Sequence, residues 1–240
     1  MTETGDREHY GIDAPTVVRT LGAGGIALIV VGLIAGRIPA VAPLMPMLVG
    51  TGIGMTLGAA WMLVSSLWLK RIVMRHLLDT RRWQGDEQVL DIGSGRGLVA
   101  IGAARRVPRG MVHALDIWQQ ADLSGNTPAA LLANGRAAGV AERLAVDTGD
   151  ARRMPYPDAT FDVVASMTAI HNIPDAAGRT TAIAEAWRVT RPGGQLLIFD
   201  IRHARTYAAQ LRALGAEVRL TGPIVLWGPI GWRFSATKPG

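Results

Sequence analysis

The distribution of charged residues separates an apolar N-terminal part of the chain from a mixed remainder. Between Arg19 and Arg37, and again between Arg37 and Lys70, the sequence contains no charged residue. A bilayer core of about 30 Å is spanned by about 20 apolar residues in a helix. The two intervals predict a hairpin of two transmembrane helices, about Thr20–Gly36 and Met47–Leu69, joined by a proline-rich loop.

Two other interpretations fit parts of this apolar pattern. The segments can be a pair of buried helices in a soluble protein, although core helices rarely extend so far without a charge. The tripeptide Ala40–Ala42 has the small-x-small form of a signal-peptide cleavage site. The residues before the first apolar run are acidic, however, and a second long run follows at once. We therefore favour the hairpin.

The basic residues around the hairpin predict its orientation. The loop carries only Arg37, whereas five basic residues follow the second run: Lys70, Arg71, Arg75, Arg81 and Arg82. The positive-inside rule places both termini in the cytoplasm, so we expect a multi-pass protein of the inner (plasma) membrane with its remaining domain cytoplasmic. The formal net charge of +6 then matches an anionic inner leaflet, and we expect no nucleic acid partner because basic and aromatic residues do not alternate.

The segment after the hairpin has apolar residues at helical spacing beside basic ones. In "KRIVMRHLLDTRRW" these are Ile72, Val73, Leu77 and Leu78. Such a pattern predicts an amphipathic helix that lies in the membrane interface with its apolar face toward the lipid. The resulting organisation is a tail over 1–19, the hairpin over 20–69, a juxtamembrane helix over 70–82 and a domain over 83–240. The hairpin is also a candidate surface for oligomerisation.

From Trp83 onward, short apolar runs alternate with helical patterns. The runs are "QVLDI", "MVHALDI", "RLAVDTGD", "FDVVASM" and "QLLIFD", followed by two more near the C-terminus. Strands of this kind separated by helices predict a doubly wound, mostly parallel α/β sheet. Ligands bind at the carboxyl ends of such strands, and an acidic residue closes or follows four of them: Asp91, Asp116, Asp150 and Asp200.

A glycine-rich loop follows the first of these strands. "VLDIGSGRG" (89–97) leads directly into a helical pattern, so backbone N–H groups there can approach a ligand closely. A P-loop is excluded because Leu98-Val99 stands where Lys-Ser/Thr is needed, and the dinucleotide fingerprint is one residue longer. The chain has no cysteine, which excludes thiolate catalysis and disulfides, and the five scattered histidines have no metal-ligand spacing, so we expect no metal.

Four segments together resemble the class I S-adenosylmethionine-dependent methyltransferases. "VLDIGSGRG" resembles their first motif, "HALDIW" their second-strand motif, "TGDARRMPYPDATFDVV" their third-to-fourth-strand segment, and "RVTRPGG" the turn before strand five. The resemblance extends over about Trp83–Lys238. It implies a Rossmann-like sheet of seven strands, S-adenosyl-L-methionine as cofactor, and methyl transfer to a small molecule.

The resemblance also implies roles for individual residues. Asp91 and the backbone of the glycine loop would hold the methionine end of the cofactor, Asp116 both ribose hydroxyls, and Asp150 with the Ala151 N–H the adenine. Ile117 or Trp118 would pack on the adenine face. The full predicted cofactor set is Asp91, Gly93, Ser94, Gly95, Gly97, Asp116, Ile117, Trp118, Asp150, Ala151 and Ser166.

His171, in "SMTAIHNIP" after the fourth strand, is the candidate general base, since a histidine near neutral pH can deprotonate a phenol or amine. A structural histidine in that loop is the alternative. With a membrane hairpin before the domain, we expect O-, N- or C-methylation of an amphiphilic or lipid-like acceptor. The alternatives are an enzyme for a soluble molecule merely tethered to the membrane, and a non-catalytic cofactor-binding module.

Overall fold

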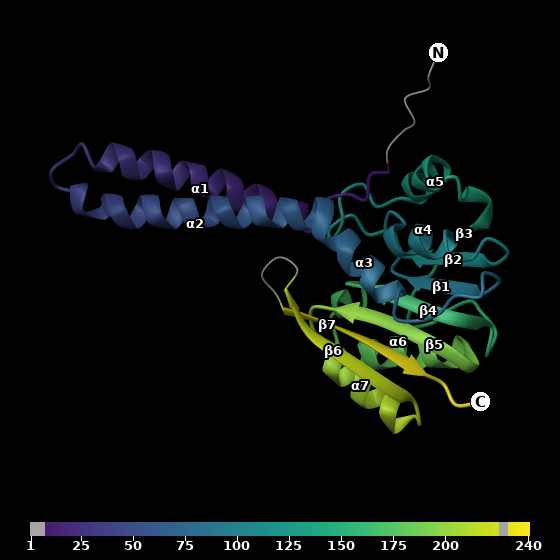
Figure 1. Ribbon diagram of the computed structural model, residues 1–240. Helices are drawn as coiled ribbons and strands as arrows, with labels where there is room; N and C mark the ends of the chain where they lie inside the picture. Colours follow the sequence, from purple (N-terminus) through teal and green to yellow (C-terminus); the bar gives the residue numbers. More distant parts are fainter. Residues whose placement is uncertain (1–7, 226–229) are drawn as a thin grey trace, which may run out of the picture.

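The computed structural model describes residues 8–225 and 230–240 and consists of a globular α/β domain with a helical hairpin projecting from it (Figure 1). The hairpin is made of α1 (Pro15–Ala35) and α2 (Met45–Val64), which lie where the charge-free intervals predict helices. A π-helical stretch, Ser65–Leu69, continues α2 into α3 (Lys70–Leu78). A single helical run therefore leads from the hairpin into the domain.

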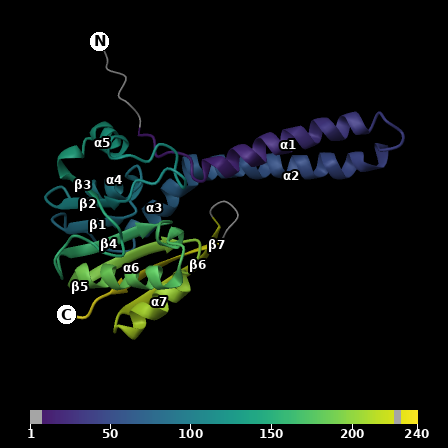
Figure 2. The same ribbon diagram turned by 180° about the vertical axis from the view of Figure 1, so that it is seen from behind.

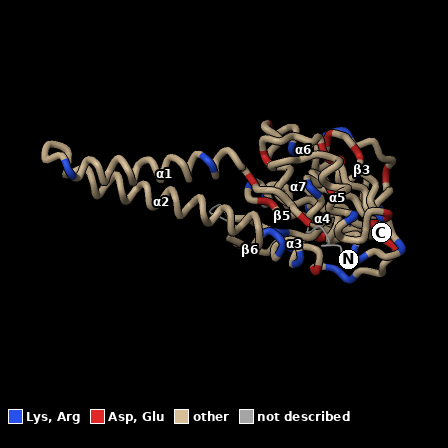
Figure 3. The backbone as a smooth tube through the Cα atoms, turned by 90° about the horizontal axis from the view of Figure 1, so that it is seen from above, with Lys and Arg blue, Asp and Glu red and all other residues tan. Residues whose placement is uncertain are grey.

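The two hairpin helices approach each other closely at small residues. A Cβ atom added to Gly25 would lie 2.7 Å from the carbonyl oxygen of Gly52, and one added to Gly52 would lie 2.6 Å from that of Gly25. Such backbone contact is typical of helices packed in lipid. The most apolar windows of the two helical runs are each only 17% buried, and charge is almost absent along the hairpin (Figure 3). Core helices of a soluble domain would be mostly buried instead.

The domain is built on one seven-stranded sheet in the order β3-β2-β1-β4-β5-β7-β6, in which β7 runs opposite to the other six strands. This confirms the predicted doubly wound, mostly parallel architecture. The strands are β1 (Gln88–Ile92), β2 (Met111–Asp116), β3 (Leu144–Thr148), β4 (Phe161–Met167), β5 (Thr190–Asp200), β6 (Glu217–Val225) and β7 (Ile230–Thr237).

Helices cover both faces of the sheet (Figures 1 and 2). One face packs against α3, α4 (Leu98–Ala104) and α5 (Pro128–Ala137), and the other against α6 (Ala176–Val189) and α7 (Ala204–Ala213). Side-chain caps stand at the start of two of these helices. Thr127 accepts a hydrogen bond from the Ala130 N–H at 3.1 Å, and Asp175 accepts one from the Gly178 N–H at 2.6 Å. These side chains fix where α5 and α6 begin.

The apolar face of α3 packs on the domain, which corrects the prediction that it faces the membrane. Val73, Leu77 and Leu78 are buried in the same cluster as α4, and a Cβ atom on Gly102 of α4 would lie 2.6 Å from Met74 Sδ. Only Ile72 of the predicted apolar face is exposed. An amphipathic helix has the same sequence pattern whether its partner is lipid or a sheet, so the pattern alone could not separate the two.

The residues before α1 do not form a free tail, because residues 9–14 are fastened to the domain. The Ala14 N–H donates to the Asp122 carbonyl at 2.9 Å, and the Ser124 N–H donates to that of Ile12 at 3.1 Å. The buried Lys70 ammonium donates to the carbonyl oxygens of Tyr10 and Gly11 and to Asp13 Oδ1, at 3.0, 2.9 and 3.1 Å. We call residues 9–14 the N-terminal strap.

The Lys70 contacts predict that the strap loosens when the ammonium is removed. In Lys70→Met, three oxygens lose a charged donor, and we expect local opening of the strap to become easier by about 2 kcal/mol. Backbone amides of the strap would then exchange hydrogen roughly 30-fold faster. Hydrogen-exchange mass spectrometry measures this, with the exposed Arg75→Met as control. Unchanged exchange would show that Lys70 does not hold the strap.

Candidate functional site

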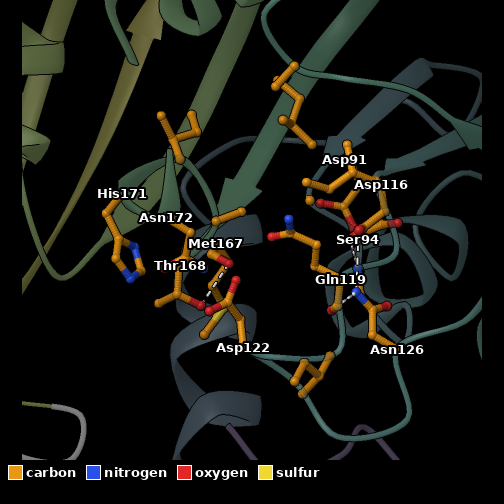
Figure 4. A pocket seen from close by; sticks show the side chains of 18 of the residues that line it. Asp91, Ser94, Asp116, Gln119, Asp122, Asn126, Met167, Thr168, His171 and Asn172 are labelled. Carbon is orange, nitrogen blue, oxygen red and sulfur yellow. Dashed lines mark hydrogen bonds between the residues drawn. The ribbon is translucent and has the colours of Figure 1, made fainter. Parts of the chain in front are cut away.

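A cavity of about 860 Å³ opens at the carboxyl edge of the parallel strands. Its walls come from the segments that follow β1, β2, β3, β4 and β5 and from the N-terminal strap. Figure 4 shows two sides, with Asp91, Asp116 and Asn126 on one and Thr168 and His171 on the other. The sequence-predicted residues that line it are Asp91, Gly93, Ser94, Gly95, Asp116, Ile117, Asp150, Ala151 and His171.

The loop between β1 and α4 depends on glycine because of its backbone shape. Gly93, Gly95 and Gly97 have φ of +70°, +55° and +86°, a region that side chains disfavour. A Cβ atom on Gly93 would also lie 2.2 Å from the Ala169 Cβ atom, and one on Gly95 would lie 2.8 Å from Leu123. The glycines therefore let two neighbouring protein segments close over the loop, in addition to exposing its amides.

Asp116, at the end of β2, is a buried carboxylate held by three donors. Its Oδ2 accepts from the Gly95 N–H at 2.8 Å, and its Oδ1 accepts from the Trp118 N–H at 2.6 Å and from Asn126 Nδ2 at 3.3 Å. These bonds fix the carboxylate against the glycine loop. Since each carboxylate oxygen has further acceptor capacity, Asp116 can also receive hydroxyl donors from the cavity.

Asp91, at the end of β1, is buried beside Asp116. Its Oδ2 accepts a hydrogen bond from the Ala100 N–H in the first turn of α4, at 2.9 Å. Burial nevertheless raises the pKa of Asp91, and the neighbouring Asp116 carboxylate adds to the increase, while the hydrogen bond from the Ala100 amide opposes it. The resulting pKa is about 8. A cation placed in this part of the cavity would favour the ionised form of Asp91.

Asp150 lines the cavity but is engaged by a neighbour. Both of its carboxylate oxygens accept from Arg152 Nε at 3.0 Å, and the Arg152 backbone N–H donates to Oδ1 at 2.8 Å. The Arg152 guanidinium holds the pKa of Asp150 below its usual value. The predicted adenine contact at Asp150 therefore competes with a local ion pair, while Ile117 stands exposed at the cavity wall.

Three predicted cofactor residues lie elsewhere. Trp118 adopts φ of +61° and its indole Nε1 donates to the Thr148 hydroxyl at 2.8 Å, so the ring stands outside the cavity lining. Ser166 is buried within β4 and donates to the Ile92 carbonyl at 2.9 Å. Gly97 serves as the N-cap of α4. Stacking on adenine by Trp118 and cofactor contact by Ser166 are thus not supported by their positions.

On the opposite side of the cavity, His171 is paired with the buried Asp200 from the end of β5. His171 Nδ1 lies 2.5 Å from Asp200 Oδ1, a close contact between imidazole and carboxylate that is not aligned as a hydrogen bond. The carboxylate is itself held by the backbone N–H groups of His171 and Ile201, at 3.2 and 2.8 Å. This arrangement orients the imidazole at the cavity wall.

Several lining residues were not predicted from the sequence. Gln119, Asp122 and Asn126 come from the segment after β2, and Tyr10 and Asp13 come from the strap. The first group lies in the polar stretch "DIWQQADLSGN", which directly follows the second predicted strand. The strap gives no local signal, because its place on the domain depends on contacts such as His9 N–H to Asn134 Oδ1, 125 residues apart.

The cofactor side of the cavity fits a polar ligand. Ser94 Oγ and Asn126 Oδ1 are buried and have no hydrogen-bond partner within the described residues. Buried polar atoms are normally paired, so such atoms in a cavity wall indicate groups that a ligand satisfies. Together with Asp116 and Asp91 they offer acceptors for hydroxyls and a cation, which are the groups that the ribose and methionine ends of S-adenosylmethionine carry.

Residues 90–198 match a family model described as a methyltransferase domain. A ubiquinone/menaquinone biosynthesis C-methyltransferase from Roseobacter denitrificans is 29% identical over 147 residues, which cover 61% of this chain and 55% of that protein. A demethylmenaquinone methyltransferase from Deinococcus radiodurans is 34% identical over 115 residues, covering 47% and 42%. The chain therefore spans about half the length of the curated relatives it matches.

Solved structures share the fold of the domain. A structure of an S-adenosylmethionine-dependent methyltransferase from Aquifex aeolicus superimposes with a TM-score of 0.53 at 19% identity, covering 68% of this chain and 87% of that one. The identity is low, so this likeness concerns the fold alone. The family match over residues 90–198, the similar relatives and the composition of the cavity wall all agree with a class I S-adenosylmethionine-dependent methyltransferase domain.

Proposed function

We propose that this protein is a membrane-anchored methyltransferase that transfers the methyl group of S-adenosylmethionine to a small amphiphilic acceptor of quinol or phenol type. The observation that carries the proposal is the composition of one cavity. Its wall combines Asp91 and Asp116 with Lys70 and Tyr10, which belong to the base of the hairpin and the strap. The names of the similar quinone-pathway methyltransferases support the acceptor class.

The cofactor would be held by the wall around the glycine loop. Asp116 would accept the ribose hydroxyls, Ser94 Oγ and Asn126 Oδ1 would gain the partners they lack, and Asp91 would face the cationic methionine end. When bound, S-adenosylmethionine supplies an electrophilic methyl group on a sulfonium ion, and the neutral thioether that remains is a good leaving group that needs no acid from the protein. Binding and orientation are then the main work of these residues.

His171 is placed to take a proton from the acceptor. With its Nδ1 next to Asp200, its Nε2 is left to accept hydrogen from a hydroxyl in the cavity, and the carboxylate stabilises the imidazolium that forms. A phenol or quinol hydroxyl that loses its proton becomes a stronger nucleophile at oxygen and at the ring carbon beside it. The pair therefore suits O- or C-methylation of such a ring.

The membrane location rests on the hairpin. Its exposed apolar surface and glycine contacts suit lipid, and the basic residues of α3 at its domain end favour the cytoplasmic side of a plasma membrane. Because the cavity lies at the sheet edge where the hairpin joins, an acceptor dissolved in the bilayer would have a short path to it. A soluble acceptor would gain nothing from this arrangement.

The proposal is tested by comparing lipid extracts of cells that make the wild-type protein, the His171→Gln variant or neither. With wild type we expect a quinone or phenolic lipid that is heavier by one methylene group, and with His171→Gln we expect much less of it at equal cofactor binding. When the methyl group of the cofactor is labelled, label in a water-soluble product would contradict the acceptor class. No label transfer in any fraction would favour a non-catalytic module.

The Asp116 contacts predict the cofactor affinity of a variant. In Asp116→Ala the ribose hydroxyls and the Gly95 amide lose their common acceptor in a buried site, so binding should weaken by about 1.5–3 kcal/mol. Calorimetry with S-adenosylmethionine measures this, and Asp158→Ala, which removes an exposed carboxylate paired with Arg188, is the control. Binding of NADH in place of S-adenosylmethionine would refute the cofactor assignment.

The raised pKa of Asp91 predicts a pH dependence of binding. A cationic ligand favours the carboxylate, so binding releases the proton that Asp91 holds below pH about 8. Affinity for S-adenosylmethionine should therefore rise as the pH increases toward 8 and level off above it. Calorimetry in buffers of different ionisation enthalpy detects the released proton. Asp91→Asn should abolish the release, and an unchanged release in this variant would assign it to another group.

A further inference from the structure

The far end of the β6–β7 hairpin reaches past the edge of the sheet at which the cavity opens. Asp200, the last residue of β5, pairs with Trp232 of β7, and β7 begins two residues earlier, at Ile230. Ile230 pairs in turn with Val225, where β6 ends. Two residues of strand rise by about 7 Å, so this end projects beyond the carboxyl edge on the side of the α1–α2 hairpin (Figures 1 and 2).

This projecting end carries apolar side chains in the open. Val225 is 62% exposed and Ile230 is 51% exposed. Nearby, at the junction of the transmembrane-type helix and the domain, Trp68 is 61% and Ile72 46% exposed. Arg233 of β7 donates to the His76 carbonyl of α3 at 2.8 Å, so β7 is in direct contact with the helix that carries Ile72. Exposed apolar side chains of this kind are typical of a surface that a membrane or another molecule covers.

Basic side chains border these apolar residues. Arg202 and Arg205 follow β5 at the same edge and are exposed, and the Arg205 guanidinium stacks over the Trp232 ring at 4.1 Å from its centre. Arg75 adds a further exposed cation from α3. Apolar side chains surrounded by arginine complement the interface of an anionic bilayer, where the former enter the acyl boundary and the latter meet headgroups.

We propose that the end of β6 and the start of β7, where Val225 pairs with Ile230, form a second membrane contact that lies on anionic lipid beside the α1–α2 hairpin. The inference depends on the proposed membrane anchoring and adds to it a fixed tilt of the domain. With the hairpin base on one side and the β6–β7 end on the other, the cavity mouth faces the bilayer surface between two contacts. An acceptor would pass from lipid to the cavity without crossing open water.

Because the chain contains no cysteine, single cysteines can report the contact in the full-length protein. We would attach a nitroxide to Val225→Cys and reconstitute the protein in vesicles of phosphatidylglycerol and phosphatidylethanolamine. Collision with oxygen, which dissolves in lipid, is then compared with collision with a water-soluble nickel complex. Leu57→Cys, on the exposed side of α2, reports anchoring, and Leu214→Cys, an exposed apolar position at the opposite end of β6, is the matched control.

We expect the Val225 label to be protected from nickel and accessible to oxygen, like Leu57, while Leu214 stays accessible to nickel. Protection at Leu57 without protection at Val225 overturns the second contact and leaves the anchoring intact. Nickel access at Leu57 overturns the anchoring itself, and the second contact with it. An immobile Val225 label with spin–spin coupling between chains would assign the surface to a second copy. Equal protection of Val225 in neutral phosphatidylcholine would overturn the role given to the arginines.

Discussion

A buried ammonium group joins the three parts of the molecule on which the proposed activity depends. Lys70 stands at the start of α3, lines the cavity, and donates to Tyr10, Gly11 and Asp13 of the strap. A buried cation is tolerated when oxygens surround it, and departure of the strap would take away the three oxygens that Lys70 contacts. The hairpin, which connects the strap to Lys70 through α1 and α2, is thereby fixed to the wall of the cavity at both of its ends.

Some features of the site can be predicted from the sequence alone, because the partners of the residues involved follow from the local pattern or from the sheet topology. Asp91 and Asp116 end apolar strands of a parallel sheet, and the topology of such a sheet brings the two ends together, so their convergence at one cavity could be predicted. Asp175 and Thr127 likewise act through neighbours three residues away. In each case the physical partner is close in sequence or is dictated by the architecture.

Other features depend on partners that a local pattern does not specify. The apolar face of α3 has the same spacing whether it meets lipid or a sheet, and only the structure assigns Val73 and Leu77 to the core. Trp118 follows Asp116 closely, but its positive φ turns the indole to Thr148. The strap is recognised only through contacts such as His9 with Asn134, which lie 125 residues apart.

The continuity of helix between α2 and α3 has a mechanical consequence for the proposed mechanism. A flexible linker would let the domain rotate above a membrane and present its cavity in any direction, whereas a helical run fastened by Lys70 and by the packing of α3 against α4 transmits one orientation. Asp200 connects this orientation to the chemistry. It ends β5 at the edge beside the hairpin, holds His171 at the cavity wall, and pairs through the sheet with Trp232 just below the exposed Ile230. The candidate base, the cavity mouth and the apolar edge are therefore set by the same strand ends, and a change in the tilt of the domain would move all three together.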